Sequence, residues 1–389
     1  MTPLRIVTGI AVIWLIFDPQ PVVGFVAYTL IGLQVLGWLW PRIARNQITW
    51  QRCAPLALAP NEVAEVEILV TYRGWLPLPY LVVREDIPVM LGSVPRREWV
   101  LSLWPGQRHT LRYPIQCRQR GLYWLGPLSL RIGSVFEQNE IQLTEQQPTP
   151  ITVTPAVVSL RLLHLIAALP HSQERYHLSL CEDATQKTGI RTYQVGDPPR
   201  RIDWKTSARL GDLQVRELTP TIARETLIVL AFAEAEYPGR FAYDNRERAV
   251  VATASLATTL IQRRQAVGLC SNGYDPLHRK AGITLLPATG VEHLRELLVR
   301  LGRLEPATDV PLIEEVITGE PVLRPGATLV LITSALSTQI LTTLVAIRQR
   351  AMKAVLVLTD PVLSDLLQAQ QYGIVTLQID RTGAIIPCA

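Results

Sequence analysis

The chain begins with two long runs of apolar residues. Residues 6–17 carry no charged side chain, and residues 22–40 are uncharged and largely apolar, with Gln34 as their one amide side chain. As a helix the second run spans roughly 28 Å, close to the bilayer hydrocarbon thickness of about 30 Å. The first run is short, and a cleaved signal peptide is the alternative, but a second apolar run follows instead of a small-residue cleavage site. The pattern predicts a transmembrane helical hairpin over residues 1–45.

The charges around this hairpin predict its orientation. Arg5 precedes it and Arg42 and Arg45 follow it, whereas the connecting turn carries Asp18 and no basic residue. Because basic residues favour the cytoplasmic side, both termini and the remaining domains are expected in the cytoplasm, on a two-pass protein of the plasma (inner) membrane. The five cysteines show no paired spacing, which fits a reducing compartment and argues against a zinc site or a disulfide framework.

Residues 46–155 alternate between apolar and polar positions as strands do. The clearest alternations are residues 63–72 and 107–117, and proline- or glycine-containing turns separate the predicted strands. This spacing predicts a small antiparallel β-sandwich. Trp75, Trp99 and Trp104 lie in this part, either as an exposed binding face or, as the favoured interpretation, packed in the core.

Residues 225–389 show a different pattern, in which apolar runs alternate with amphipathic segments. Residues 226–232 form a continuous apolar run, as buried parallel strands do, and the apolar positions between 250 and 261 share one helical face. Further runs at 329–333 and 354–358 continue the series. The prediction is a doubly wound α/β domain with a parallel sheet. No glycine-rich phosphate loop follows its first strand, which argues against the usual nucleotide-binding fold.

Residues 156–224 connect these two domains and carry an unusual density of charge. Between residues 187 and 216 there are seven basic and three acidic residues, and Gly196-Asp197-Pro198-Pro199 predicts a turn. Beyond the turn there is no helical or strand period. So many polar groups among aromatics are costly unless they pair with one another or meet a partner. The candidate site residues are Gly189, Arg191, Tyr193, Gly196, Asp197, Arg200, Arg201, Asp203, Trp204, Lys205, Ser207 and Arg209.

The order of these residues closely resembles the signature of the bacterial family called domain of unknown function 58. The pieces at 120–127 and 153–155 look like the family's lead-in, although residues 133–136 read Gly-Ser-Val-Phe where the family usually has Asp-Pro-Phe-Gly. The resemblance implies that residues 225–389 form a von Willebrand factor A-like domain. It also implies MoxR-type ATPases and other von Willebrand A-like proteins as partners.

Von Willebrand A domains typically hold a divalent ion with an Asp-x-Ser-x-Ser motif after the first strand. The matching positions here are Ala231, Ala233 and Ala235, and alanine side chains have no oxygen to offer a hard cation. We therefore expect a degenerate site with no metal, and no cofactor. The neighbouring Glu234 and Glu236 are interpreted as solvated loop charges.

The favoured hypothesis is a non-enzymatic, membrane-anchored interaction or scaffold protein that works with a MoxR-type ATPase in complex assembly or envelope maintenance. Basic signature residues would pair with Asp197 and Asp203 or with an acidic partner surface. Tyr193 and Trp204 would be anchors of the kind that dominate interfaces. The stretch could instead only lock the connecting segment onto its domain. Because Trp204 is large enough to need burial, its loss is expected to destabilise the protein.

Two other hypotheses remain open. A hydrolase-like enzyme would use Asp197, Asp203, Lys205 and Ser207, since Lys205 and Ser207 share a face in an extended segment; the chain offers no nucleophile elbow and no histidine in a motif. A module for nucleic acid or anionic lipid would use the positive surplus, in line with the net charge of +5. Its bases are interleaved with acids, so no nucleic acid is expected as a partner.

Overall fold

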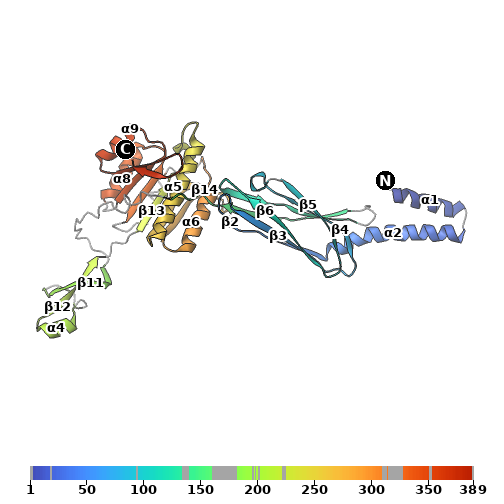
Figure 1. Cartoon of the computed structure of the whole chain (residues 1–389), viewed down its shortest axis with the longest axis horizontal. Coiled ribbons are helices and arrows are strands. Elements are labelled where there is room, and N and C mark those ends of the chain that lie inside the picture. The colour runs from blue at the N-terminus through green and yellow to red at the C-terminus, as the bar shows by residue number, and fades with distance from the viewer. Residues whose placement is uncertain are drawn as a thin grey trace. The chain divides into compact units, whose positions relative to one another are not determined.

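The computed structural model describes residues 3–17, 20–92, 95–133, 140–159, 182–194, 197, 199, 202–220, 225–308, 313, 327–349 and 353–387. The chain divides into two compact units (Figure 1). The first is built on residues 1–156, with 276–278 and 298–304. The second is built on residues 157–275, 279–297 and 305–389.

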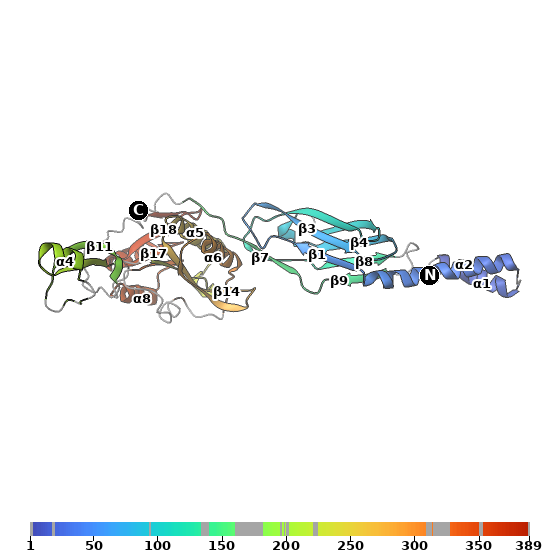
Figure 2. The same cartoon turned by 90° about the horizontal axis from the view of Figure 1, so that it is seen from below.

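The first unit begins with two apolar helices, α1 (Pro3–Phe17) and α2 (Pro21–Arg45). They run side by side in both views (Figures 1 and 2), and the Gln34 side-chain amide donates a hydrogen bond to the Thr8 hydroxyl. Many of their large apolar side chains, such as Trp14 and Phe25, are exposed. By length and composition α2 can cross a membrane, and residues 6–17 form a shorter apolar helix. The predicted apolar N-terminal helix is therefore present.

A β-rich region follows, as the alternating pattern predicts. Connections β3–β4 and β5–β6 pass between a sheet of order β1-β3-β6 and a sheet of order β5-β4-β8-β9, while β2-β10-β7 form a third. Side chains from the strands share one core that includes Ile68, Val83 and Tyr113. The strands are β1 (Ile48–Cys53), β2 (Ala57–Leu58), β3 (Val63–Tyr72), β4 (Leu78–Asp86), β5 (Arg96–Leu103), β6 (Arg108–Gln116), β7 (Gly121–Leu125), β8 (Leu128–Gly133), β9 (Glu140–Thr144) and β10 (Thr149–Val153).

A buried charge network crosses this core. The side chains of Arg52 and Glu85 are 2% and 0% exposed, and Arg52 Nε donates to Glu85 Oε1 over 2.7 Å. The same guanidinium lies 2.7 Å from Glu145 Oε2 and donates to Thr149 Oγ1 over 2.7 Å. Burial raises the pKa of Glu85, and the charge of Arg52 opposes that rise. Arg52 thus ties β1 to β4 through an ion pair and to β10 through a hydrogen bond to Thr149.

The second unit contains a mixed sheet of order β15-β14-β13-β16-β17-β18-β19. Its five central strands are parallel, as predicted, whereas β15 and β19 are antiparallel edges. Apolar residues on β13 pack against α8, and all but the first residue of β13 are buried. The strands are β13 (Glu225–Leu230), β14 (Ala266–Asp275), β15 (Lys280–Ala288), β16 (Thr328–Thr333), β17 (Lys353–Leu358), β18 (Val375–Ile379) and β19 (Ile385–Pro387), and helices in this part of the chain include α5 (Ala242–Gln262), α6 (Val291–Arg303), α8 (Thr338–Gln349) and α9 (Leu363–Gln371).

Candidate functional site

The signature residues fall on a small module of two strands and a helix, drawn in green in Figure 1. Strand β11 (Glu182–Thr192) pairs antiparallel with β12 (Gln214–Pro220), and helix α4 (Trp204–Leu210) lies between them in the sequence. Gly189 lies in β11, opposite Glu217. Three of the predicted site residues, Gly196, Arg200 and Arg201, lie outside the described residues.

Arg191, near the end of β11, forms a bidentate ion pair with Asp197. Arg191 donates to both carboxylate oxygens of Asp197, over 2.8 Å and 2.6 Å. The backbone N–H of Gln194 donates to the same carboxylate over 2.9 Å. The hydrogen bond from Arg191, followed by the one from Gln194, lowers the pKa of Asp197. This pair links the end of β11 to Asp197. Next to it, the Tyr193 backbone N–H donates to the Leu213 carbonyl.

Asp203 and Ser207 attach α4 to β12. Asp203 is the N-cap of the helix, where its side chain accepts from the Thr206 N–H over 3.2 Å. The Ser207 hydroxyl donates to the Asp203 carbonyl and accepts from the Gln214 N–H, both over 2.8 Å. Asp203, Ser207 and Gln214 are buried. These contacts hold the module together internally.

The helix itself differs from the sequence-based expectation, which found no helical period here. It begins because Asp203 caps it and ends because Gly211 adopts a left-handed φ of 81°. Lys205 and Ser207 therefore do not share a face in an extended segment. Lys205 is exposed, whereas the buried Ser207 hydroxyl is engaged in the hydrogen bonds above. This geometry does not supply the nucleophile and base that the hydrolase hypothesis requires.

The opposite side of α4 presents Trp204, Lys205 and Arg209 to solvent. Trp204 is 66% exposed, and Leu210 and Leu213 of the same module are exposed as well. The expectation that Trp204 needs burial is wrong, because the inner side of this short helix is occupied by Ser207. The signature thus divides into a buried frame and an exposed surface with one indole and two cations. We call Trp204, Lys205 and Arg209 the α4 surface.

A second candidate place is the carboxyl edge of the parallel sheet, where the chain order reverses between β13 and β16. Glu236 Oε1 accepts from Asn272 Nδ2 and from the Ile313 N–H, each over 2.9 Å, and Oε2 accepts from the Ala233 N–H over 2.9 Å. The Ser334 hydroxyl donates to the Glu236 carbonyl. The interpretation of Glu236 as a solvated loop charge is wrong, whereas Glu234 is exposed.

These residues do not fit a divalent ion. Ala231, Ala233 and Ala235 offer no side-chain oxygen, and both oxygens of the Glu236 carboxylate already accept N–H groups. Among the described residues, no three or more His, Cys, Asp or Glu side chains group as metal ligands would. In place of an ion, Glu236 joins the loop after β13 to Asn272 of β14 and to Ile313.

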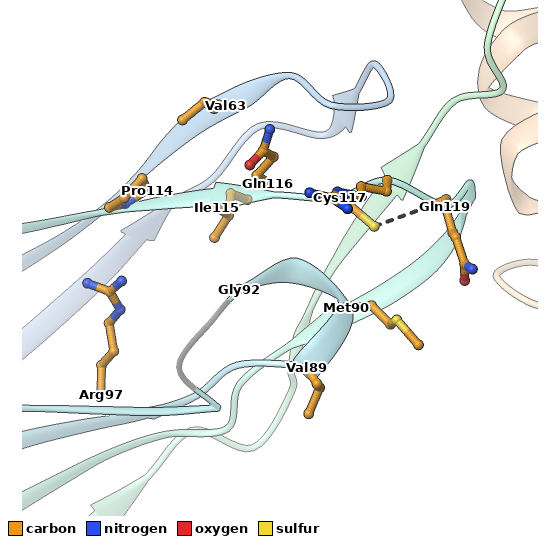
Figure 3. A pocket seen from close by; sticks show the side chains of 11 residues that line it. Val63, Val89, Met90, Gly92, Arg97, Pro114, Ile115, Gln116, Cys117 and Gln119 are labelled. Atoms are coloured by element: carbon orange, nitrogen blue, oxygen red, sulfur yellow. Dashed lines mark hydrogen bonds between the residues drawn. The ribbon is translucent and has the colours of Figure 1, made fainter.

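A pocket of about 620 Å³ lies in the first unit (Figure 3). Arg97 extends from one wall, and Ile115 points into the space from β6. The Arg97 guanidinium lies 5.5 Å from the centre of the Tyr113 ring. The Cys117 thiol donates to the Gln119 carbonyl over 3.1 Å. The residues that line it carry no carboxylate and no imidazole, so they offer no acid–base pair.

The protein combines an apolar N-terminal helix, a β-rich region and a mixed α/β sheet. The model of the family described as "Protein of unknown function DUF58" matches residues 189–384, half of the chain, and the chain belongs to this family. It is also 24% identical over 220 residues to "Uncharacterized protein YeaD" of Bacillus subtilis. That alignment covers 54% of the chain and 52% of the relative, so the chain spans about half of the relative's length.

Similar solved structures match smaller parts of the chain. The CARDB domain of the PF1109 protein from Pyrococcus furiosus is 23% identical, with 27% of this chain and 91% of that one covered, at a TM-score of 0.21. Proximal thread matrix protein 1 from the mussel byssus is 11% identical, with 41% and 43% covered, at a TM-score of 0.27. TM-scores of this size do not define a common overall fold.

Proposed function

We propose that this protein is a non-enzymatic, membrane-anchored interaction protein whose recognition surface is the α4 surface. The observation that carries the proposal is the division within the signature. Asp203 and Ser207 are buried and hold the module together, while Trp204, Lys205 and Arg209 extend into solvent. Exposed tryptophan and arginine side chains are of the kinds that dominate binding energy at protein interfaces.

The partner that fits this surface has an acidic face with a recess for an indole ring. Among the partners that the family resemblance implies, a MoxR-type ATPase is the one we propose, acting with this protein in complex assembly or envelope maintenance. Two features support a von Willebrand A-like domain with a degenerate metal site. The parallel strands lie in the order β14-β13-β16-β17-β18, with β15 antiparallel at the edge. Ala231 and Ala233 stand where oxygen ligands would be needed.

Changing Trp204 to alanine is expected to weaken partner binding without changing the melting temperature, because the indole is exposed. Loss of an interface anchor costs about 2 kcal/mol, or roughly thirty-fold in affinity. The measurement is crosslinked capture of the ATPase by the full chain in membranes, paired with a thermal melt of each variant. Lys205→Ala should weaken capture by a smaller factor.

The matched control is Trp124→Ala, which removes another exposed tryptophan, on β7. It should leave capture unchanged. If Trp204→Ala retains full capture, or melts early, the signature is only an internal lock and the proposal fails.

The anchor in this proposal is a hairpin of α1 and α2 with both ends in the cytoplasm. Its support is the length and composition of α2 and the arginines in the last turn, Arg42 and Arg45. The hydrogen bond between Gln34 and Thr8 also satisfies two polar side chains within the helix pair, as a bilayer interior requires.

Cysteine labelling should detect this orientation. A cysteine at Gln20, between the helices, is expected to react with a membrane-impermeant maleimide added to intact cells. A cysteine at the exposed Arg381 should react only after permeabilisation. The wild-type chain is the control for its own cysteines. Labelling of position 381 in intact cells would contradict the orientation.

A further inference from the structure

Two tryptophans of the β-rich region are exposed where the sequence favoured core packing. Trp75 is 70% exposed and Trp104 is 67% exposed, while Trp99 packs half-buried against the core. Core packing was therefore the wrong interpretation for Trp75 and Trp104. Large aromatic side chains exposed on loops are costly to leave in water, which points to a contact that covers them.

Both tryptophans lie at the same end of the β-rich region. Trp75 is in the loop from β3 to β4, and Trp104 is in the loop from β5 to β6. Strand pairing places the two loops together, because Thr71 is opposite Arg108 and Leu78 is opposite Leu103. A hydrogen bond over 3.0 Å from the Tyr72 N–H to the Gln107 carbonyl joins the loops directly.

The end of α2 is attached to this same end. The Gln47 N–H donates to the Ala44 carbonyl in the last turn of α2 over 3.0 Å, and the Arg73 N–H donates to the Gln47 carbonyl over 2.9 Å. The contact is close, since a Cβ on Gly74 would lie 2.6 Å from Gln47 Oε1. Backbone hydrogen bonds thus connect the apolar helix to the loop that carries Trp75.

The charge at this end is positive. Arg42 and Arg45 from the last turn of α2, Arg73 beside Trp75, and Arg108 after Trp104 are all exposed. The sequence segments around them, residues 38–61, 73–84 and 103–111, contain no Asp or Glu. Strand pairing through Gly133 brings Glu140 to this end as well, and its carboxylate lies 3.8 Å from Arg131. Tryptophan with arginine at the end of an apolar helix is the composition of a membrane–water interface.

We infer that the β-rich region docks on the membrane surface through Trp75 and Trp104, with Arg73 and Arg108 on anionic phospholipid headgroups. The indole rings lie at the headgroup level, where one edge is apolar and the N–H meets water. This inference rests on the proposed membrane anchoring by α2, and it adds a second contact that holds the β-rich region against the bilayer.

Tryptophan quenching by brominated lipids tests the inference on the full chain. The protein is reconstituted in vesicles of phosphatidylcholine and phosphatidylglycerol with bromines on the acyl chains close to the headgroups. Removing two quenched indoles, by Trp75→Phe with Trp104→Phe, should lower the fraction of the fluorescence that is quenched. The matched control, Trp124→Phe, removes an indole at the opposite end of the β-rich region, where the Gly126 N–H donates to the Asp86 carbonyl at the end of β4, and it should raise that fraction.

Charge reversal tests the headgroup contact. Arg73→Glu with Arg108→Glu should reduce quenching of the loop tryptophans in vesicles with phosphatidylglycerol, and much less in phosphatidylcholine alone. If the loop variant raises the quenched fraction as the control does, the docking inference is overturned while the anchor stands. If the wild-type chain shows no quenching, Trp14 and Trp38 of the helices are not in lipid, and anchoring and docking both fail.

Discussion

Replacing Arg52 by methionine is expected to lower the free energy of unfolding of the β-rich region by about 3–5 kcal/mol. The substitution leaves the fully buried carboxylate of Glu85 without its cation, since Arg52 Nε is its ion partner at 2.7 Å. Breaking one side of a buried pair costs more than the pair contributes, because an uncompensated charge remains in the protein interior. Urea unfolding, followed by a spectroscopic probe of the β-rich region, measures the loss.

A double variant and a surface control make this result specific. Arg52→Met with Glu85→Leu removes both charges and should recover most of the stability. Arg112→Met breaks the exposed pair with Glu67 and should cost under about 1 kcal/mol. If Arg52→Met costs no more than Arg112→Met, the buried pair does not have the role assigned to it.

The Arg52→Met loss should also depend on pH. Burial raises the pKa of Glu85 and Arg52 opposes the rise, so without Arg52 the pKa is higher still. A raised folded-state pKa gives stability that is complete below the unfolded value of about 4.3 and is lost as the pH rises through the folded value. The loss in Arg52→Met should therefore be largest at neutral pH and shrink as the pH falls toward about 4.

The second large effect is expected at Glu236. Glu236→Ala removes the acceptor of three N–H groups, on Ala233, Asn272 and Ile313, and should destabilise the second unit by about 2–3 kcal/mol. The exposed Glu234 is the matched control, and Glu234→Ala should change stability by less than about 0.5 kcal/mol. Thermal melts of both variants compare the losses.

Magnesium completes the Glu236 experiment. Because the Glu236 oxygens accept protein N–H groups, the melting temperature of the wild-type chain should not change with magnesium or with EDTA. A magnesium-dependent rise of several degrees that EDTA reverses would show that a divalent ion does bind there. A Glu236→Ala variant as stable as Glu234→Ala would show that the carboxylate is not the link between these segments.

Much of the fold follows from local patterns. The alternation at residues 63–72 coincides with β3, and the apolar runs at 226–232 and 329–333 overlap β13 and β16. Periodicity predicts such elements because each residue reports which side of its own strand or helix is covered. It did not predict α4, a helix of seven residues with no apolar stripe. Its local signals were the cap Asp203 and the terminating Gly211.

Pattern and composition alone therefore established the apolar helix, the strand-rich region, the α/β sheet and the residues of the signature. Tertiary structure decided which polar groups contact one another, because the partners are distant in sequence. Examples are Arg52 with Glu85 and Glu236 with Asn272. Tertiary structure also decided which side chains are exposed to solvent. The hydrophobicity of tryptophan is the same at every position, but Trp204 lies on the outer side of α4, and Trp75 and Trp104 lie on loops beyond the core. A side chain's burial depends on what other segments bring to it, and no local pattern contains that information.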